Sequence, residues 1–352
     1  MAAPNTYWQI LTKVVEKMQN DTFFLRQALI GNDSFNSLTD KVMVRNVVTG
    51  KTAASIGLRG DPANAVNIGV TLDDVEKTPP QIFETDYVAE QHILQNFDPN
   101  TLDVLSAQSD IVRSFGYYYG RKLTGMRLRY DRAVEKMIGQ IASSGKIAVD
   151  DDKRSFEIDF NTKKLNYTLN TSADPLSDIG EMCQKYGDEN GVFPNVIMTT
   201  QAIANKILAH AKVEKWINKN TFSFGQLASR FQNPSIRFMG SFSEFAIPDI
   251  YVYTGDYKDA SGTAHKYIDD GKLIITNTDY WSLGHAAMVD YDVAGQTSVV
   301  PNESNNGLFV GDFLVKEKIS DDGTKKMLYF RSYPLPMVDH GDYVHTATVT
   351  VE

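Results

Sequence analysis

The sequence contains very little cysteine and no long hydrophobic run. Cys183 is the single cysteine among 352 residues, so no disulfide can form within the chain and a secreted cysteine framework is excluded. No segment approaches the roughly 18 consecutive apolar residues of a membrane-spanning helix. The first twenty residues lack the unbroken apolar core of a signal peptide. We therefore expect a protein of a reducing, aqueous compartment, with no membrane partner.

The motifs of common enzyme and cofactor sites are also missing. The six histidines form no H-x-x-x-H pair and have no cysteine companions, so the spacing of metal ligands is absent. There is no G-x-S-x-G elbow. The segment 116–125, GYYYGRKLTG, superficially resembles a phosphate-binding loop, but it has the wrong spacing and lies within a helical pattern. We predict no catalytic residue, no cofactor and no bound metal.

An α/β enzyme whose site is built from scattered residues is the alternative from another class. Its first suspects are the acidic turn Asp150, Asp151 and Asp152, together with His340 or His345. The three aspartates lack the alternating oxygen spacing and the glycine of a calcium loop. An exposed turn is therefore the preferred interpretation of that segment.

The overall composition is that of a soluble globular protein. Hydrophobic residues make up 42% of the chain and charged residues 22%, and the length suffices for one large domain or two ordinary ones. The formal net charge is −9. An acidic surface of this kind favours solubility and discourages general nucleic-acid binding.

One long amphipathic helix is the strongest pattern in the sequence. Apolar residues recur in steps of three or four at Phe115, Tyr119, Leu123, Met126, Tyr130, Val134, Met137 and Ile141. A helix over 103–142 would be a rod roughly 60 Å long, at ~1.5 Å per residue. A compact domain of this size does not need such a helix merely to fill its core.

The same segment is basic although the chain as a whole is acidic. Residues 111–141 contain seven basic and two acidic side chains. Away from the apolar stripe, a basic row is formed by Lys122, Arg129, Arg132 and Lys136. Such a row is usually a solvated face. If the protein assembles, the row would either face nucleic acid without sequence preference or pair with acidic groups of adjacent subunits.

A long hairpin precedes this helix. Two extended segments, 41–60 and 70–90, are joined by a polar turn region that includes Gly60 and Gly69. The hairpin has too few apolar residues to build a core, so we expect it to lean on another chain. The candidate intersubunit residues are Val42, Val44, Lys51, Arg59, Ile68 and Val70.

The rest of the chain mixes helices and strands, and the fold class is therefore α+β. Two strands with a polar turn follow Gly145. A helix is predicted to begin at Pro175 and to end just before Gly187. The segment 194–217 predicts a buried strand, a threonine cap and two helices. Beyond residue 234 the chain is mostly strand and turn.

The order of these elements resembles the major capsid proteins of tailed phages with the Hong Kong 97 fold, and most closely the lambda-type branch. The similar segments are FLRQALI with KVMV, FDPNTLDVLSAQ, NVIMTTQAIANKIL, YVYTGDYKDASGTAHKYIDDGKLIITNT and RSYPLPMVDHGDYVHTATV. Together they cover nearly the whole chain, in the order that the family has.

The resemblance implies a division of the chain into named parts. These parts are an N-terminal arm (1–38), an extended two-stranded E-loop (39–92), a P domain with the spine helix (93–171), a mixed α/β A domain (172–325) and C-terminal strands that return to the P domain (326–352). The E-loop would lie across a neighbouring subunit. Lys51 lies in a loop where some relatives form a crosslink, but no motif supports that chemistry here.

The resemblance also implies a structural function. The protein would self-assemble as hexamers and pentamers into the icosahedral head shell around packaged double-stranded DNA, in the host cytoplasm, and would remain in the virion head. A separate scaffolding protein, a portal and a decoration protein would be its partners, and packaged DNA would contact the inner face without sequence preference. An encapsulin-like compartment with enzyme cargo is the alternative within the same fold.

Overall fold

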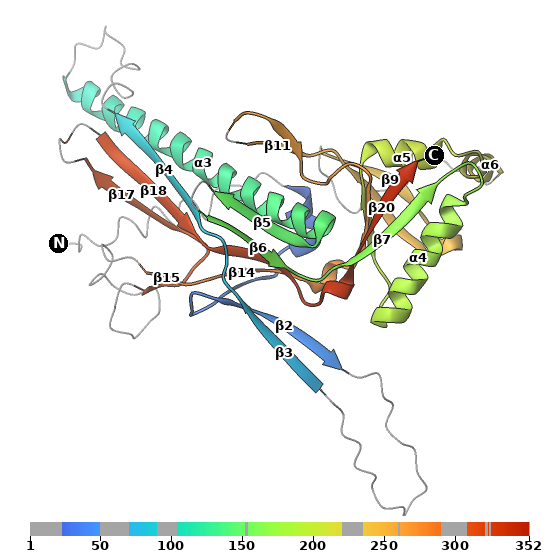
Figure 1. Cartoon of the computed structure of the whole chain (residues 1–352). Coiled ribbons are helices and arrows are strands. Elements are labelled where there is room, and N and C mark those ends of the chain that lie inside the picture. The colour runs from blue at the N-terminus through green and yellow to red at the C-terminus, as the bar shows by residue number, and fades with distance from the viewer. Residues whose placement is uncertain are drawn as a thin grey trace, which may run out of the picture.

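The computed structural model shows an elongated molecule with two lobes and a projecting arm (Figure 1). One lobe is built on a long helix, and the other contains shorter helices. The residues that the structure describes are 23–49, 70–89, 104–151, 154–219, 235–259, 261–289, 308–320, 323 and 325–351.

The long helix α3 (Val104–Ser144) forms one edge of the first lobe. Its apolar stripe is buried from Leu123 to Ile141. The helix ends at Gly145, which adopts φ 75° and donates its N–H to the carbonyl of Ile141 at 2.8 Å. A left-handed residue of this kind commonly terminates a helix, and glycine adopts it without steric cost. The predicted helix over 103–142 is confirmed.

An antiparallel sheet lies along this helix. Its order is β17–β18–β4, with β4 at Ile82–Ala89, β17 at Leu314–Ile319 and β18 at Lys325–Ser332. Alternate residues of β18 point to opposite faces. Leu328 and Phe330 are fully buried, and the ring of Phe330 lies 5.6 Å from that of Tyr130 on α3. One face of the sheet is therefore packed on the helix.

The second lobe is a six-stranded sheet covered by helices. The sheet order is β7–β20–β13–β8–β10–β9, with β7 at Lys163–Leu169, β8 at Val196–Thr199, β9 at Ile236–Phe242, β10 at Ile247–Tyr253, β13 at Lys272–Thr276 and β20 at Val344–Val351. The helices are α4 (Pro175–Asn190), α5 (Gln201–Leu208) and α6 (Ala211–Lys219). The predicted buried strand before α5 is confirmed, because all of β8 is buried.

The end of α4 differs from the prediction. The helix continues through Gly187 to Asn190, and Gly191 caps it at φ 73°. A Cβ atom on Gly187 would lie 2.9 Å from the ring of Phe193. Gly187 therefore permits close packing within the helix, and the capping role belongs to Gly191. The start at Pro175 is confirmed.

The projecting arm consists of β2 (Val42–Thr49) and β3 (Val70–Lys77). These strands pair with each other in a two-stranded sheet, and they extend away from both lobes (Figure 1). At the base of the arm, Val42 is fully buried. A Cβ atom on Gly284 would lie 2.5 Å from Val42 Cγ1, so the glycine lets the arm's base approach the body closely.

The remaining elements connect these units. A third sheet has the order β1–β14–β19, with β1 at Ser34–Asn36, β14 at Trp281–His285 and β19 at Pro334–Val338. The short hairpins pair β5 (Lys146–Asp151) with β6 (Arg154–Asp159), β11 (Asp256–Lys258) with β12 (Ala264–Lys266), and β15 (Met288–Val289) with β16 (Leu308–Phe309). The short helical turns are η2 (Arg26–Ile30), η3 (Ser243–Phe245), η4 (Thr278–Tyr280) and η5 (Gly341–Tyr343).

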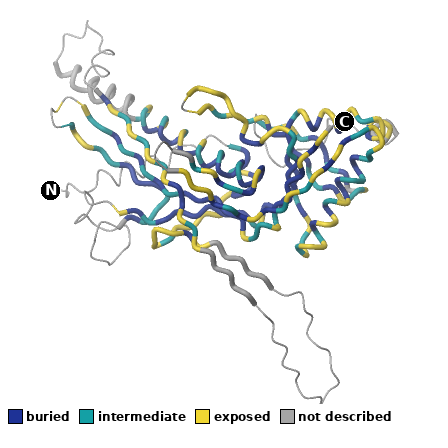
Figure 2. The backbone as a smooth tube through the Cα atoms, in the orientation of Figure 1, coloured by how far each residue is buried: buried dark blue, intermediate teal, exposed yellow. Residues whose placement is uncertain are grey.

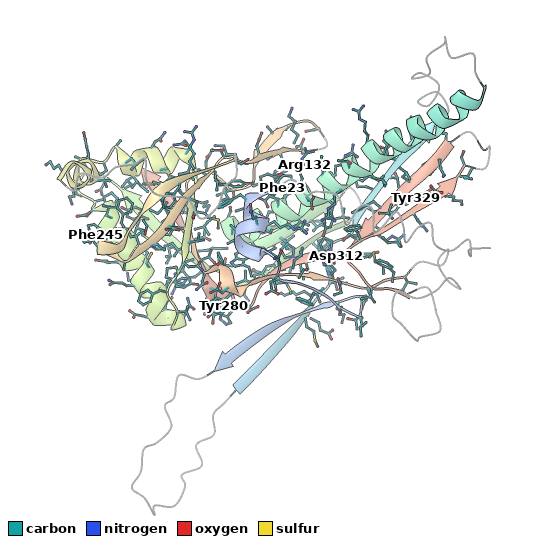
Figure 3. All side chains as sticks on the ribbon, turned by 180° about the vertical axis from the view of Figure 1, so that it is seen from behind. Phe23, Arg132, Phe245, Tyr280, Asp312 and Tyr329 are labelled. Carbon is teal, nitrogen blue, oxygen red and sulfur yellow. The ribbon has the colours of Figure 1, made fainter. Side chains whose placement is uncertain are left out.

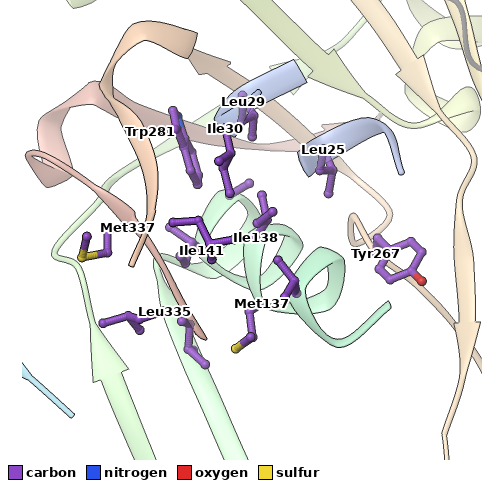
Figure 4. Close-up of a cluster of buried hydrophobic side chains, with 14 of the residues drawn as sticks. Leu25, Leu29, Ile30, Met137, Ile138, Ile141, Tyr267, Trp281, Leu335 and Met337 are labelled. Atoms are coloured by element: carbon purple, nitrogen blue, oxygen red, sulfur yellow. The ribbon is translucent and has the colours of Figure 1, made fainter. Parts of the chain in front are cut away.

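The main hydrophobic core lies where α3 meets η2, β14 and β19. Leu25, Ile30, Ile138 and Trp281 contribute to one buried cluster (Figure 4), and a second cluster fills the other lobe. Buried residues, in dark blue, gather where the strands and helices of each lobe pack together (Figure 2). Strands β18 and β19 belong to the first lobe and β20 to the second. The division of the chain into five parts remains a prediction.

Candidate functional site along the long helix

A fully buried carboxylate on α3 anchors the segment that precedes β1. The Oε1 atom of Glu135 accepts hydrogen bonds from the backbone N–H of Leu25 at 2.8 Å and from the hydroxyl of Tyr253 at 2.7 Å. Its Oε2 atom accepts from the N–H of Arg26 at 2.9 Å. Burial raises the pKa of Glu135 to about 7, although its hydrogen-bond donors act to lower it. One side chain thus joins the N-terminal segment, α3 and β10.

A second carboxylate, one turn earlier on α3, holds two arginines. Asp131 pairs with Arg26 of the N-terminal segment through Oδ1, and with Arg127 through Oδ2 at 3.3 Å. The guanidinium of Arg127 also lies over the rings of Tyr130 and Phe313, at 5.1 and 4.7 Å. Burial raises the pKa of Asp131 and the two arginines oppose that shift. Such a buried pair needs several donors to offset desolvation, and here it has them.

The network continues to β14 through a tyrosine and a histidine. The hydroxyl of Tyr130 and Nε2 of His285 lie 2.8 Å apart, and Nδ1 of His285 lies 3.6 Å from the carboxylate of Asp312. The side chain of His285 is fully buried. Burial lowers the pKa of His285 to about 4, although Asp312 acts to raise it. His285 is therefore neutral at pH 7.

This network is suited to holding elements together. Its central side chains, Tyr130, Asp131, Glu135 and His285, have at most 1% of their surface exposed, so dissolved molecules do not reach them. Among the described residues, no group of three acidic, histidine or cysteine side chains could hold a metal ion. The geometry supports the fixing of the N-terminal segment to α3.

The role of these residues was not predicted from the sequence, in which Asp131 and Glu135 are the two acidic residues of a basic segment. A signal was present, because Arg127, Asp131, Glu135, Ile138 and Ala142 repeat in steps of three or four beside the apolar stripe. All five are buried. The buried face of α3 is therefore wider than its apolar residues alone indicate.

The four residues of the predicted basic row have different surroundings within the subunit. Lys122 pairs with Asp86 at 2.9 Å and Arg129 with Glu84 at 2.8 Å, so both bind β4 of their own chain. This partner was not among those that the sequence suggested.

The other two residues of the row have different surroundings. The ammonium of Lys136 lies over the ring of Tyr257 at 5.2 Å. Arg132 is exposed and makes no ion pair with any residue that the structure describes; Figure 3 shows it on the flank of α3. The contact of this row with DNA or with a neighbour remains a prediction, and Arg132 is its best-placed member.

The pair of Arg129 and Glu84 gives a test of this arrangement. Arg129→Glu is expected to lower the free energy of unfolding by about 1 kcal/mol or less, because 60% of the Arg129 side chain is exposed. The double change Arg129→Glu with Glu84→Arg should recover most of that loss. Denaturant unfolding of the unchanged protein, the single variant and the double variant measures both effects. Arg132→Glu serves as the unpaired control. Equal losses in the single and double variants would contradict the pairing.

Three of the six candidate arm residues lie within the part of the chain that the structure describes. Val42 packs within its own chain, at the base of the arm. The backbones of Val44 and Val70 lie in β2 and β3, opposite Val75 and Thr49. Lys51, Arg59 and Ile68 lie outside the described residues. Contacts of this set with another subunit remain a prediction.

The residues suggested for the alternative enzyme site lie on different elements of the fold. His345 is buried in β20, with its Nε2 atom 3.4 Å from Glu189 on α4. His340 instead precedes η5, where its Nδ1 atom accepts a hydrogen bond from the N–H of Asp342. Asp150 and Asp151 lie in β5, and Asp152 lies outside the described residues.

Comparison with known proteins identifies the family. The family described as phage major capsid protein E matches residues 8–349. Among solved structures, the protein assigned as the capsid protein of a prophage of E. coli CFT073 superposes with a TM-score of 0.63 at 15% identity, covering 99% of this chain and 100% of that one. A search of the curated proteins finds no match.

Two further solved structures show weaker similarity. The structure described as Gordonia phage Cozz has a TM-score of 0.48 at 12% identity, with 97% of this chain and 93% of that chain covered. A phage-related protein from Bordetella bronchiseptica RB50 has a TM-score of 0.46 at 11% identity, with 96% and 95% covered. The family match favours a capsid protein over the encapsulin-like compartment and over the enzyme. The expected α+β capsid fold is confirmed.

Proposed function

The chain belongs to the phage major capsid protein E family, and from this premise we propose how its parts serve the shell. It is a structural protein of the phage virion head. No helix among the described residues has the length and apolar character needed to cross a membrane. The proposal concerns the contacts that each subunit makes with the others and with the contents of the shell.

The projecting arm carries the proposal. Strands β2 and β3 hydrogen-bond to each other and extend away from both lobes (Figure 1). An isolated two-stranded hairpin is marginally stable in water. In a closed shell of identical subunits, an arm that lies across a neighbour gains the buried surface that its own chain does not supply. The arm is therefore the E-loop of the shell, and it joins adjacent subunits in hexamers and pentamers.

The network around Glu135 serves the same assembly from inside the subunit. It fixes Leu25 and Arg26, which lie within the predicted N-terminal arm (1–38), on α3. An N-terminal arm that reaches a neighbour transmits force only if the end joined to its own subunit is held. Asp131 and Glu135 hold that end.

The proposal extends to the partners of a tailed-phage head. A separate scaffolding protein directs assembly, a portal occupies one vertex, and a decoration protein reinforces the shell. Packaged double-stranded DNA contacts the inner face without sequence preference. This inventory rests on the family alone.

Shortening the arm tests the proposal. Arg45 and Asp74 are cross-strand partners, so residues 46–73 can be replaced by an Asn-Gly turn that suits a two-residue hairpin. We expect a folded subunit that forms no shells, because the arm no longer reaches a neighbour. Electron microscopy and light scattering measure assembly, and circular dichroism checks folding.

A matched variant controls for the new turn. Asp151 and Arg154 are partners at the end of the β5–β6 hairpin, and Asn-Gly in place of residues 152–153 changes that turn without touching the arm. This control should assemble like the unchanged protein. Normal shells from the shortened arm would refute the role of the arm. A strictly monomeric unchanged protein, with and without scaffolding protein, would refute self-assembly.

A further inference from the structure

The face of the β17–β18–β4 sheet that points away from α3 carries large exposed aromatic side chains. Strand register places Phe83 opposite Arg331 and Tyr87 opposite Met327, on the face opposite to that of Leu328 and Phe330. Phe83 is 48% exposed and Tyr87 44%. We call this surface, defined by Phe83, Tyr87, Tyr329, Lys318, Lys325 and Arg331, the outer sheet face.

The carboxylates of the three strands lie on one face of the sheet only. On the side toward α3, Glu84 and Asp86 pair with Arg129 and Lys122 of the helix. Glu317 lies on the same side by register and pairs with Lys326 at 2.9 Å.

The opposite side carries the positive charge. Lys316, Lys318, Lys325 and Arg331 occupy the outer sheet face, and the described residues of the three strands place no carboxylate there. This face is therefore locally basic in an acidic protein.

The cations of this face lie over its aromatic rings. The ammonium of Lys325 is 5.4 Å from the ring centre of Tyr87, and the guanidinium of Arg331 is 5.5 Å from that of Phe83. The rings of Phe83 and Tyr329 stack on each other at 6.2 Å. These cation–π contacts hold the long side chains flat against the sheet. The cations of Lys325 and Arg331 and the rings of Phe83, Tyr87 and Tyr329 thus form one contiguous surface.

This composition is typical of a protein interface. Aromatic residues and arginine are enriched at the centres of interfaces and dominate their energetics. A cation lies over one face of each of these rings, Arg331 over Phe83 and Lys325 over Tyr87. Bases therefore find few free ring faces on which to stack, unlike at the platforms that bind single-stranded nucleic acid.

Charge complementarity favours a second copy of this chain as the occupant. Removing the four positive charges of this face from the formal net charge of −9 leaves −13 for the rest of the chain. The surface that a second copy presents is thus acidic on average, and acidic and basic patches steer one another together. In a shell, such copies surround every subunit.

We infer that the outer sheet face binds a carboxylate-bearing surface of a second copy of this chain during shell assembly. The inference rests on the proposed self-assembly, and it assigns one side of a heterologous contact. The aromatic rings supply the apolar burial of that contact, and Lys318, Lys325 and Arg331 supply its charge complementarity.

The test is a charge reversal at two exposed residues, Lys318→Glu with Lys325→Glu. The matched control is Lys185→Glu with Lys206→Glu, which makes the same change in net charge on exposed positions of α4 and α5. We expect the outer-face variant to assemble at least about tenfold more slowly than the control, because its steering charge is inverted. Phe83→Ser, which removes a ring but no charge, should also reduce assembly.

The outcomes separate the competing explanations. Assembly of the outer-face variant at the control's rate would overturn the inference, and so would normal shells that retain less DNA or bind less decoration protein. If the unchanged protein does not assemble under any condition, the proposed function fails, whatever the variants do. If circular dichroism shows that the double variant is unfolded, Lys318→Glu alone, at an exposed position of β17, decides in its place.

Discussion

Replacing Glu135 by alanine is expected to lower the free energy of unfolding of the subunit by about 3 to 5 kcal/mol. The substitution leaves the N–H groups of Leu25 and Arg26 and the hydroxyl of Tyr253 without their acceptor, and each buried donor left unsatisfied costs about 1 to 3 kcal/mol. The loss should be local first. The segment from Leu25 to Ile30 is expected to leave α3 before the rest of the subunit unfolds.

Hydrogen exchange of the unassembled subunit measures this effect. The amides of Leu25 and Arg26 should lose protection in the Glu135→Ala variant, while those of β8 in the other lobe keep theirs. Tyr253→Phe removes one of the three donors and should cost about 1 kcal/mol. Glu181→Ala, at an exposed position of α4, is the control. A loss in Glu135→Ala no greater than in this control would show that the carboxylate does not hold the segment.

Acid is expected to destabilise the subunit through two buried histidines. Burial lowers the pKa of His285 and of His345 to about 4, from an ordinary value of about 6.5. In the unfolded chain both become charged as the pH falls through 6.5, whereas in the folded protein they stay neutral until about pH 4. The stability that they contribute is therefore present above pH 6.5 and is lost between pH 6.5 and pH 4.

The buried Glu135 changes the stability in the opposite direction over nearly the same pH range. Its folded pKa of about 7 lies above the ordinary value of about 4.3 for a glutamate, so it stabilises the fold as the pH falls from 7 to about 4.5. At about 1.4 kcal/mol per pKa unit, each histidine lowers the free energy of unfolding by about 3 kcal/mol over this range. Protonation of Glu135 raises it by about the same amount. The expected net loss between pH 7 and pH 4 is about 3 kcal/mol.

Denaturant unfolding at a series of pH values checks this balance. His345→Gln should flatten the stability curve between pH 6.5 and 4, and His285→Gln should do the same. Glu135→Gln should remove the stabilisation that Glu135 provides as the pH falls. The free energy of unfolding of this variant should therefore decrease more steeply between pH 6.5 and 4. An unaltered curve in both histidine variants would exclude them as the cause of acid sensitivity.

Periodicity was enough to predict the elements that bury one continuous face. The stripe from Phe115 to Ile141 predicted α3, and Pro175 predicted the start of α4. The wrong end of α4 has a physical cause, since a glycine serves a cap and a close contact equally well. Gly187 makes room for the ring of Phe193, a neighbour that local pattern does not reveal.

The polar network required contacts that no local pattern contains. Glu135 binds Leu25 and Tyr253, which lie 110 and 118 residues away along the chain. Likewise, Lys122 and Arg129 on α3 find their partners on β4, so a row that looked available for DNA is partly used within the subunit. Family resemblance predicted the fold and function, but it did not indicate which polar residues face inward.

The position of β20 in the six-stranded sheet has a consequence for how the protein is made. Residues 344–351 lie between β7 (163–169) and β13 (272–276) and hydrogen-bond to both. During synthesis, this sheet is interrupted until residue 351 has left the ribosome, because the strand that bridges β7 to β13 is synthesised last of the three. Contacts of such high sequence separation form slowly. A nascent chain therefore completes the sheet of its second lobe only after β20 has been synthesised.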